Sequence, residues 1–301
     1  MRRAILGMVS LVLAAGAAAQ DRGTLLGGAK KRILFFTKSS GFEHSVIKKP
    51  DDKPSHAEKV LLDLAAQNGW EVVHTKDGGV FTAENLAKFD AFFFYTTGDL
   101  TTQGRDNGKP MTAEGKSAFL EAIKNGKGFI GSHSASDTFH SPGSRFAEAG
   151  EKMDPYLRML GGEFIRHGKQ QTTRMTLASP KFPGAEGIQG GGFDLHEEWY
   201  SFKDYADDLH VILVSETEKM AKTGGDSVYN RPPYPATWAR MHGKGRVFYT
   251  SMGHREDVWT NPVFQNLLVG GIKWALKEAE ADVTPNVEKV SPGYRVIPPE
   301  K

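Results

Sequence analysis

The sequence of 301 residues contains no cysteine. Its absence excludes disulfide bonds, a cysteine nucleophile and thiolate metal ligands, so a metal site would have to use histidine, aspartate or glutamate. A protein exported without disulfides must be stabilised by its hydrophobic core, and one large domain of this length can bury enough apolar surface to do so.

The amino terminus has the pattern of an export signal. Arg2 and Arg3 precede an apolar run over residues 4–15, which is too short to span a bilayer, and alanines at 17–19 form a small-residue cleavage site. We predict cleavage near Ala19 by the general secretory route, because other residues of a twin-arginine signal are missing. The mature protein is then expected to be periplasmic or secreted, with residues 1–19 as its signal peptide.

An excess of either charge is also missing. The 38 basic and 36 acidic residues balance once Arg2 and Arg3 are removed with the leader. Nucleic-acid binding and adhesion to a membrane surface both depend on a basic excess, so neither is expected. No later segment approaches the roughly 18 consecutive apolar residues of a transmembrane helix, so we expect no membrane span.

Apolar runs of strand length alternate with helical patterns along the first half of the chain. Strands are predicted at 32–37, 70–74, 90–95 and 127–131, with helices at 55–68, 83–88 and 112–125. This alternation indicates parallel strands joined by right-handed crossovers, a doubly wound α/β sheet. Further strands are predicted at 171–178, 209–215 and 247–250, the last preceded by a connecting segment at 234–240. A last helix is predicted from Asn261, a mobile loop at 219–230 and a proline-rich surface tail at 281–301. No repeat or second domain is found.

Polar residues follow several of these strands. His44, His133 and His254 each come shortly after a predicted strand, at the end where open α/β sheets bind ligands. His196 and Glu198 lie in a segment rich in ionisable groups, and on an extended chain alternate residues share a face. These residues are therefore expected to meet in one cleft. The alternative for the ionisable segment at 193–200 is an acidic edge that faces solvent.

The turn after the fourth strand has the spacing of a nucleophile elbow. In Gly131-Ser132-His133-Ser134-Ala135, the exposed position of the elbow is occupied by His133. A hydrolase that uses Ser132 or Ser134 is a weaker alternative, because a catalytic triad needs a positioned base and no spacing identifies one.

Several segments together resemble the ThuA family, named for trehalose utilisation. The resemblance covers roughly residues 32–277 and departs from the family at two places, where Glu197 stands instead of a common aspartate and Phe182 instead of a frequent histidine. The segments that carry it are Pro235–Trp238, the decapeptide GRVFYTSMGH at 245–254, GGIKWA at 270–275, GFEH at 41–44, LGGEFIRH at 160–167 and EEWY at 197–200.

The resemblance implies a fold and a field of chemistry. The fold is the flavodoxin-like, class I glutamine amidotransferase-like sheet in a single domain over residues 32–277, whose elbow carries a cysteine in the amidotransferases. With His133 at the elbow and no cysteine, glutaminase activity is not expected. Family members are associated with pathways in which a sugar dehydrogenase makes a 3-keto sugar, which implies a small-molecule sugar substrate and isomerisation, elimination or hydrolysis of a keto-glycoside.

The expected site residues fall into overlapping groups. His133, Glu198, His254 and His44 are the expected catalytic residues, and His167, Tyr200, Trp238 and Arg255 the expected substrate-binding residues. A divalent metal such as zinc on His44, His133, His196 and His254 stands beside metal-free proton transfer, because no compact metal motif is present. A non-catalytic carbohydrate- or metal-binding envelope protein is the alternative to an isomerase, lyase or glycoside hydrolase.

Overall fold

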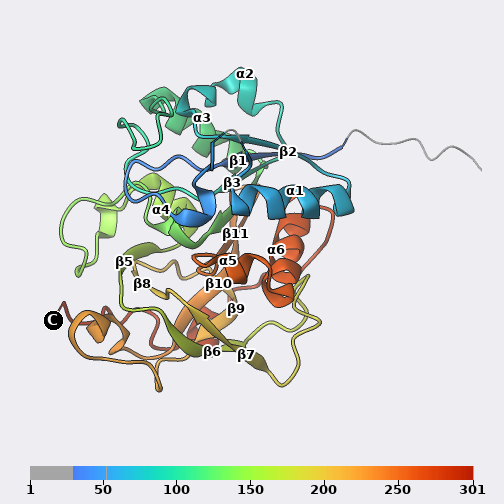
Figure 1. Ribbon diagram of the computed structural model, residues 1–301. Helices are drawn as coiled ribbons and strands as arrows, with labels where there is room; N and C mark the ends of the chain where they lie inside the picture. The colour runs from blue at the N-terminus through green and yellow to red at the C-terminus, as the bar shows by residue number, and fades with distance from the viewer. Residues whose placement is uncertain (1–29, 52, 301) are drawn as a thin grey trace, which may run out of the picture.

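The computed structural model describes residues 30–51 and 53–300, so the predicted signal peptide lies outside the described residues. Within this part of the chain, nine strands form one sheet in the order β2-β1-β3-β4-β11-β10-β9-β6-β7 (Figure 1). The strands are β1 Arg32–Phe36, β2 Glu71–Thr75, β3 Ala91–Phe94, β4 Gly128–Ser132, β6 Gln171–Leu177, β7 Gly192–Glu197, β9 His210–Ser215, β10 Tyr234–His242 and β11 Gly245–Thr250.

The sheet has a parallel half and an antiparallel half. Strands β2, β1, β3, β4 and β11 run parallel to one another, whereas β10, β9, β6 and β7 continue the sheet with antiparallel pairings. The predicted doubly wound α/β fold in a single domain is confirmed, with a sheet that is mixed. A separate antiparallel ribbon joins β5 (Glu163–His167) to β8 (Tyr200–Lys203).

Helices cover both faces of the parallel half. Helices α1 (His56–Asn68) and α6 (Pro262–Ala275) pack on one face, and α2 (Ala83–Leu86), α3 (Ala113–Lys124) and α4 (Pro155–Leu160) pack on the other. Alternate strand residues point to opposite faces, and both faces here are covered. The central strands are therefore continuous apolar runs. No helix in the described part of the chain combines the length and apolar character needed to cross a bilayer.

Local sequence signals fix the ends of the two longest helices. Ser55 accepts a hydrogen bond from the Glu58 backbone N–H and the Glu58 side chain accepts one from the Ser55 backbone, which is a capping box. Asn261 caps α6, and Pro262 occupies its first turn, where a missing N–H costs nothing. Both predicted helix starts are confirmed.

The predicted surface tail is packed against the domain. It forms the short helix α7 (Val287–Val290), and Val287 and Tyr294 are only 1% and 2% exposed. The Asn286 side chain accepts a hydrogen bond from Val211 N at 2.6 Å and donates one to Val211 O at 3.1 Å. The tail therefore extends the hydrophobic core next to β9, and the expectation of a loose tail was wrong because proline content hid two buried apolar anchors.

The segment expected to be a mobile loop at 219–230 is also structured. It contains a 3-10 helix over Gly224–Tyr229, with Val228 and Tyr229 fully buried. The Tyr229 hydroxyl donates to Trp199 O at 2.6 Å and accepts from Gly168 N at 2.9 Å. These bonds tie the segment to the chain on either side of the β5–β8 ribbon.

Tyr294→Ala tests whether the tail belongs to the core. We expect the free energy of unfolding to fall by about 3 kcal/mol, because a buried aromatic ring is removed and a cavity remains. The matched control is Val296→Ala, two residues further along, where the side chain is exposed and a change within about 0.5 kcal/mol is expected. Equal, small effects of both substitutions in chemical denaturation would contradict a docked tail.

Candidate active site at the carboxyl edge of the sheet

Four side chains meet beyond the carboxyl ends of the parallel strands, and we call them the His–Glu cluster. They are His44, His133, Glu198 and His254, and each offers one nitrogen or oxygen atom within 4.8 Å of those of the other three. His44 lies in the loop after β1, His133 directly follows β4, and His254 follows β11. Glu198 directly follows β7, which is the strand at the antiparallel edge of the sheet.

The turn that presents His133 is strained. His133 has φ +45°, a left-handed backbone conformation that non-glycine residues rarely adopt. Its ring is fully buried, and Nδ1 lies 2.9 Å from the carbonyl oxygen of Ser251. A carbonyl only accepts hydrogen bonds, so Nδ1 carries a proton and Nε2 is the ring nitrogen that faces the cluster. Nε2 lies 3.5 Å from Glu198 Oε2 and 3.3 Å from His254 Nδ1.

Glu197 fixes the backbone that carries His254. Its Oε2 accepts hydrogen bonds from Gly253 N at 2.9 Å and His254 N at 3.1 Å, and its Oε1 accepts one from Glu198 N at 2.7 Å. Gly253 has φ +119°, and a Cβ there would lie 2.7 Å from Ser132 Oγ, so no larger residue fits. Glu197 is fully buried, and the alternative of a solvated acidic edge is therefore wrong for this residue.

Glu198 is the electrostatic centre of the cluster. Burial alone would raise the pKa of its carboxyl, but hydrogen bonds and charges from His133 and His254 outweigh burial and hold that pKa well below its usual range. Burial lowers the pKa of His254, but the hydrogen bond and charge of Glu198 outweigh burial and raise that pKa above its ordinary value. The carboxylate therefore stays ionised, and it favours the cationic form of His254.

His44 is buried without a fixed partner. It is 3% exposed, and its ring centroid lies 5.0 Å from that of His133 and 5.2 Å from that of His254. Its Nδ1 is buried and has no hydrogen-bond partner among the described residues. Burial, followed by the charges of His133 and His254, lowers the pKa of His44 well below its ordinary value. The imidazole is therefore neutral, with a lone pair available.

The rim of the cluster contains groups that reach solvent. His167 is exposed and its Nδ1 lies 3.3 Å from Glu198 Oε1, whereas Tyr200 is buried with its ring centroid 4.1 Å from that of His133. Arg255 is partly exposed and donates from Nη1 to Gln170 Oε1 at 2.8 Å. The structure thus places His167, Tyr200 and Arg255 beside the predicted catalytic residues.

Phe42 is a rim residue that the sequence interpretation missed. Its side chain is 59% exposed, and its ring lies edge-on to His44 with centroids 5.0 Å apart. An exposed aromatic ring beside a buried polar cluster is suited to bind an apolar face of a ligand. The available signal was its place in the GFEH segment, two residues before His44.

Two predicted site residues lie elsewhere. His196 is exposed on β7 with Nδ1 3.3 Å from Thr172 Oγ1, outside the cluster. Because β7 ends at Glu197, the alternation that would have put His196 and Glu198 on one face stops between them. Trp238 is fully buried in β10, where its Nε1 donates to Leu160 O at 2.9 Å. Its position in a covered strand makes it a core residue, not a platform for substrate.

The serines of the elbow are not arranged as nucleophiles. Ser132 Oγ donates to Met252 O at 2.8 Å, and Ser134 Oγ is buried without a hydrogen-bond partner among the described residues. Neither hydroxyl is paired with a histidine nitrogen in the described structure, although an activated serine needs such a base. The geometry therefore favours the histidines and Glu198 as the reacting groups.

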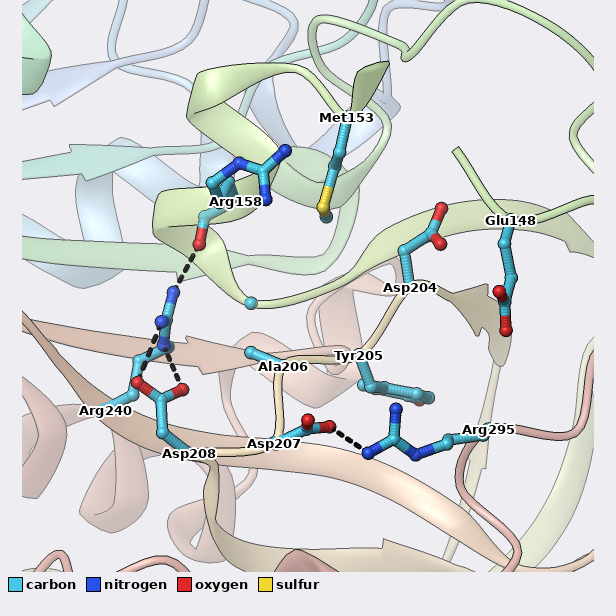
Figure 2. Close-up of a pocket in the computed structure, with 11 residues that line it drawn as sticks. Glu148, Met153, Arg158, Asp204, Tyr205, Ala206, Asp207, Asp208, Arg240 and Arg295 are labelled. Atoms are coloured by element: carbon cyan, nitrogen blue, oxygen red, sulfur yellow. Dashed lines mark hydrogen bonds and ion pairs between the residues drawn. The ribbon is translucent and has the colours of Figure 1, made fainter. Parts of the chain in front are cut away.

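A surface cavity of about 430 Å³ lies away from this site (Figure 2). Its charges are largely paired, since Arg240 holds Asp208 at 2.9 Å and Arg295 holds Asp207 at 2.6 Å. None of its lining residues belongs to the His–Glu cluster or its rim. Those residues are Glu148, Met153, Arg158, Gly161, Asp204, Tyr205, Ala206, Asp207, Asp208, Arg240 and Arg295.

The chain is similar to known proteins over most of its length. A family model described as ThuA, trehalose utilisation, matches residues 32–275. A putative ThuA-like protein from Bacteroides uniformis is 18% identical with a TM-score of 0.58, over 84% of this chain and 95% of that chain. One from Parabacteroides merdae is 15% identical with a TM-score of 0.56, over 85% and 95%. At these identities the structural likeness is one of fold. No curated protein matches the sequence.

Glu197→Gln tests the role of the buried carboxylate. Both of its oxygens accept backbone N–H groups, so an amide NH₂ would have to face at least one donor. We expect the free energy of unfolding at neutral pH to fall by about 1–3 kcal/mol. Asp194→Asn, at an exposed position of the same strand, is the control and should change stability by no more than about 0.5 kcal/mol. Equal effects in urea denaturation would refute the structural role of Glu197.

Proposed function

Because the chain belongs to the ThuA family of trehalose utilisation, we propose that it is an enzyme of carbohydrate catabolism that acts on a 3-keto-glycoside or a related oxidised sugar. One observation carries the proposal: Glu198 bridges the buried His133 and the half-buried His254 to the exposed His167. A proton-transfer site needs a basic group that can reach the substrate and nearby groups that stabilise the charge formed when the proton moves. His167 is the group within reach of the substrate, and Glu198 with its histidine partners supplies the stabilising charge.

His167 has the geometry of a general base. Its Nδ1 lies 2.9 Å from Gly168 O and 3.3 Å from Glu198 Oε1, and neither oxygen has a proton to donate at neutral pH. The proton therefore resides on Nδ1, and Nε2 keeps its lone pair. With the side chain 42% exposed, that nitrogen is open to a substrate at the mouth of the site. A carboxylate that orients a histidine in this way also stabilises the cation formed when it takes a proton.

The chemistry of a keto sugar matches these groups. A 3-keto group acidifies the C–H bond on the neighbouring carbon, and His167 Nε2 removes that proton. Negative charge then develops on the keto oxygen, where the buried end of the site with His254 can stabilise it. Returning the proton to the adjacent position completes an isomerisation. Expulsion of the glycosidic oxygen, which takes a proton from the protein, completes an elimination.

The proposal also covers location and pathway. The predicted leader at residues 1–19, with cleavage near Ala19, would send the protein out of the cytoplasm. A sugar dehydrogenase would supply the oxidised substrate, because the reaction requires a carbonyl that an ordinary glycoside lacks.

Incubation with 3-keto-trehalose and other 3-keto-glucosides in D₂O, followed by proton NMR, tests the function. We expect protein-dependent loss of the C–H signal next to the carbonyl and the appearance of a product. His167→Asn should lower kcat/KM by about 10²–10⁴-fold, as expected for loss of a general base. His196→Asn is the matched control, because that histidine is also exposed but lies outside the site, and it should retain wild-type activity.

Two results would overturn this proposal. The first is no exchange and no product across the whole panel of keto sugars. The second is sugar binding without turnover that is equally strong in wild type, His133→Ala and Glu198→Ala, which would support a carbohydrate-binding protein instead.

Phe42→Ala tests the sugar platform. Loss of the exposed ring should remove about 1–2 kcal/mol of binding and raise KM roughly tenfold with little change in kcat. Phe42→Tyr should keep the wild-type KM, and Met241→Ala should have no effect, since that exposed side chain lies on β10 away from the cluster. A fall in kcat at constant KM would instead mean that Phe42 acts by packing on His44.

A further inference from the structure

The His–Glu cluster brings together more acceptors than protons. His133 Nδ1 donates to Ser251 O, so in the neutral imidazole Nε2 is an acceptor. Glu198 adds its carboxyl oxygens, and the buried Nδ1 of His44 has no partner among the described residues. A single proton on His254 Nδ1 can be shared between His133 Nε2 at 3.3 Å and Glu198 Oε2 at 3.1 Å. One proton shared between two acceptors leaves at least one of them incompletely hydrogen-bonded, and His44 Nδ1 receives none.

The spacing of these atoms is that of metal ligands. A cation bound at about 2.1 Å separates neighbouring ligands by about 3.0 Å in an octahedral site and about 3.4 Å in a tetrahedral one. The edges that join His133 Nε2, Glu198 Oε2 and His254 Nδ1 measure 3.1, 3.3 and 3.5 Å. His44 adds a fourth ligand atom within 4.8 Å of the others.

From this geometry we propose that His44, His133, Glu198 and His254 bind one divalent transition-metal ion, with Zn²⁺ as the first candidate. Three neutral imidazoles and one carboxylate carry a single negative charge, which a dication offsets. Imidazole ligands suit zinc and its neighbours in the first transition row. The site differs from the histidine set expected from the sequence, because Glu198 takes the place of His196.

Outer hydrogen bonds already orient the ligands. The Ser251 carbonyl fixes the tautomer of His133, and Glu197 holds the backbone N–H of His254 at 3.1 Å. Metal-binding histidines are usually anchored through the other ring nitrogen, as His133 is here through Nδ1. The strained φ of His133 is also accounted for, because the turn is what aims Nε2 at the cluster.

The catalytic use of the ion rests on the proposed function, whereas the binding site does not. A divalent cation there would polarise a keto oxygen and stabilise an enediolate. His167 would stay outside the ligand set, where Glu198 still orients it as a base. The two proposals therefore assign different residues to different tasks.

Binding of Co²⁺ and Zn²⁺ to untagged, chelator-treated protein tests the site. We expect one Co²⁺ per chain, visible absorption bands that report its coordination, displacement by Zn²⁺, and a thermal unfolding midpoint that rises with Zn²⁺ concentration. Glu198→Gln and His254→Asn should each weaken binding by at least 10–100-fold. His196→Asn, outside the cluster, should bind as wild type does.

The controls separate the outcomes. Each variant is checked for a cooperative unfolding transition, and the near-isosteric Glu198→Gln carries the test if a histidine variant fails to fold. Absence of saturable binding, or equal weakening by His196→Asn and His254→Asn, would overturn the metal site. A bound metal without conversion of any keto sugar would overturn the proposed function alone, and conversion by metal-free protein would overturn the catalytic use of the ion alone.

Discussion

The buried carboxylate of Glu197 is the contact on which the rest of the site depends. It ends β7, the edge strand of the antiparallel half, and accepts two N–H groups from the loop after β11. Three strands lie between β7 and β11 in the sheet, so this hydrogen-bonded contact closes the antiparallel half over the carboxyl edge of the parallel half. The position of Glu198 is fixed by the same contact, because Glu198 is the next residue along the chain and its backbone N–H donates to Glu197 Oε1. The two adjacent glutamates thus have separate tasks: Glu197 holds the backbone of the loop after β11, and Glu198 contacts the histidines of the cluster.

Much of the fold could be predicted because the parallel half follows local rules. Continuous apolar runs mark β1, β3 and β4, which are covered on both faces, and capping residues mark the helices between them. The carboxyl end of each such strand is the ligand edge. His44, His133 and His254 could therefore be expected in one cleft because each follows a predicted strand, although the strand order itself was not predicted.

The antiparallel half could not be predicted to the same depth, because its contacts are non-local. The positions of His196 and Glu198 depend on where β7 ends, and that end is set by hydrogen bonds to a loop 56 residues further along the chain. Trp238 looked like a sugar-binding aromatic, but only the packing of the ribbon and of α4 shows that it is covered. The tail was misjudged for the same reason, since its two buried anchors are recognisable only against the surface they fill.

The energetics of the cluster favour a functional reason for its presence. Burying an ionised carboxylate among three imidazoles is costly unless opposite charge lies beside it, and an apolar core of the same volume would usually be as stable or more so. The structure adds a strained, non-glycine turn at His133 and a ring nitrogen at His44 that has no hydrogen-bond partner within residues 30–51 and 53–300. Neither feature is needed by the sheet beneath, which is closed by apolar packing on both faces. Strain and unsatisfied polarity concentrated at one ligand edge, with the surrounding domain well packed, is what a site shaped for binding and proton transfer requires.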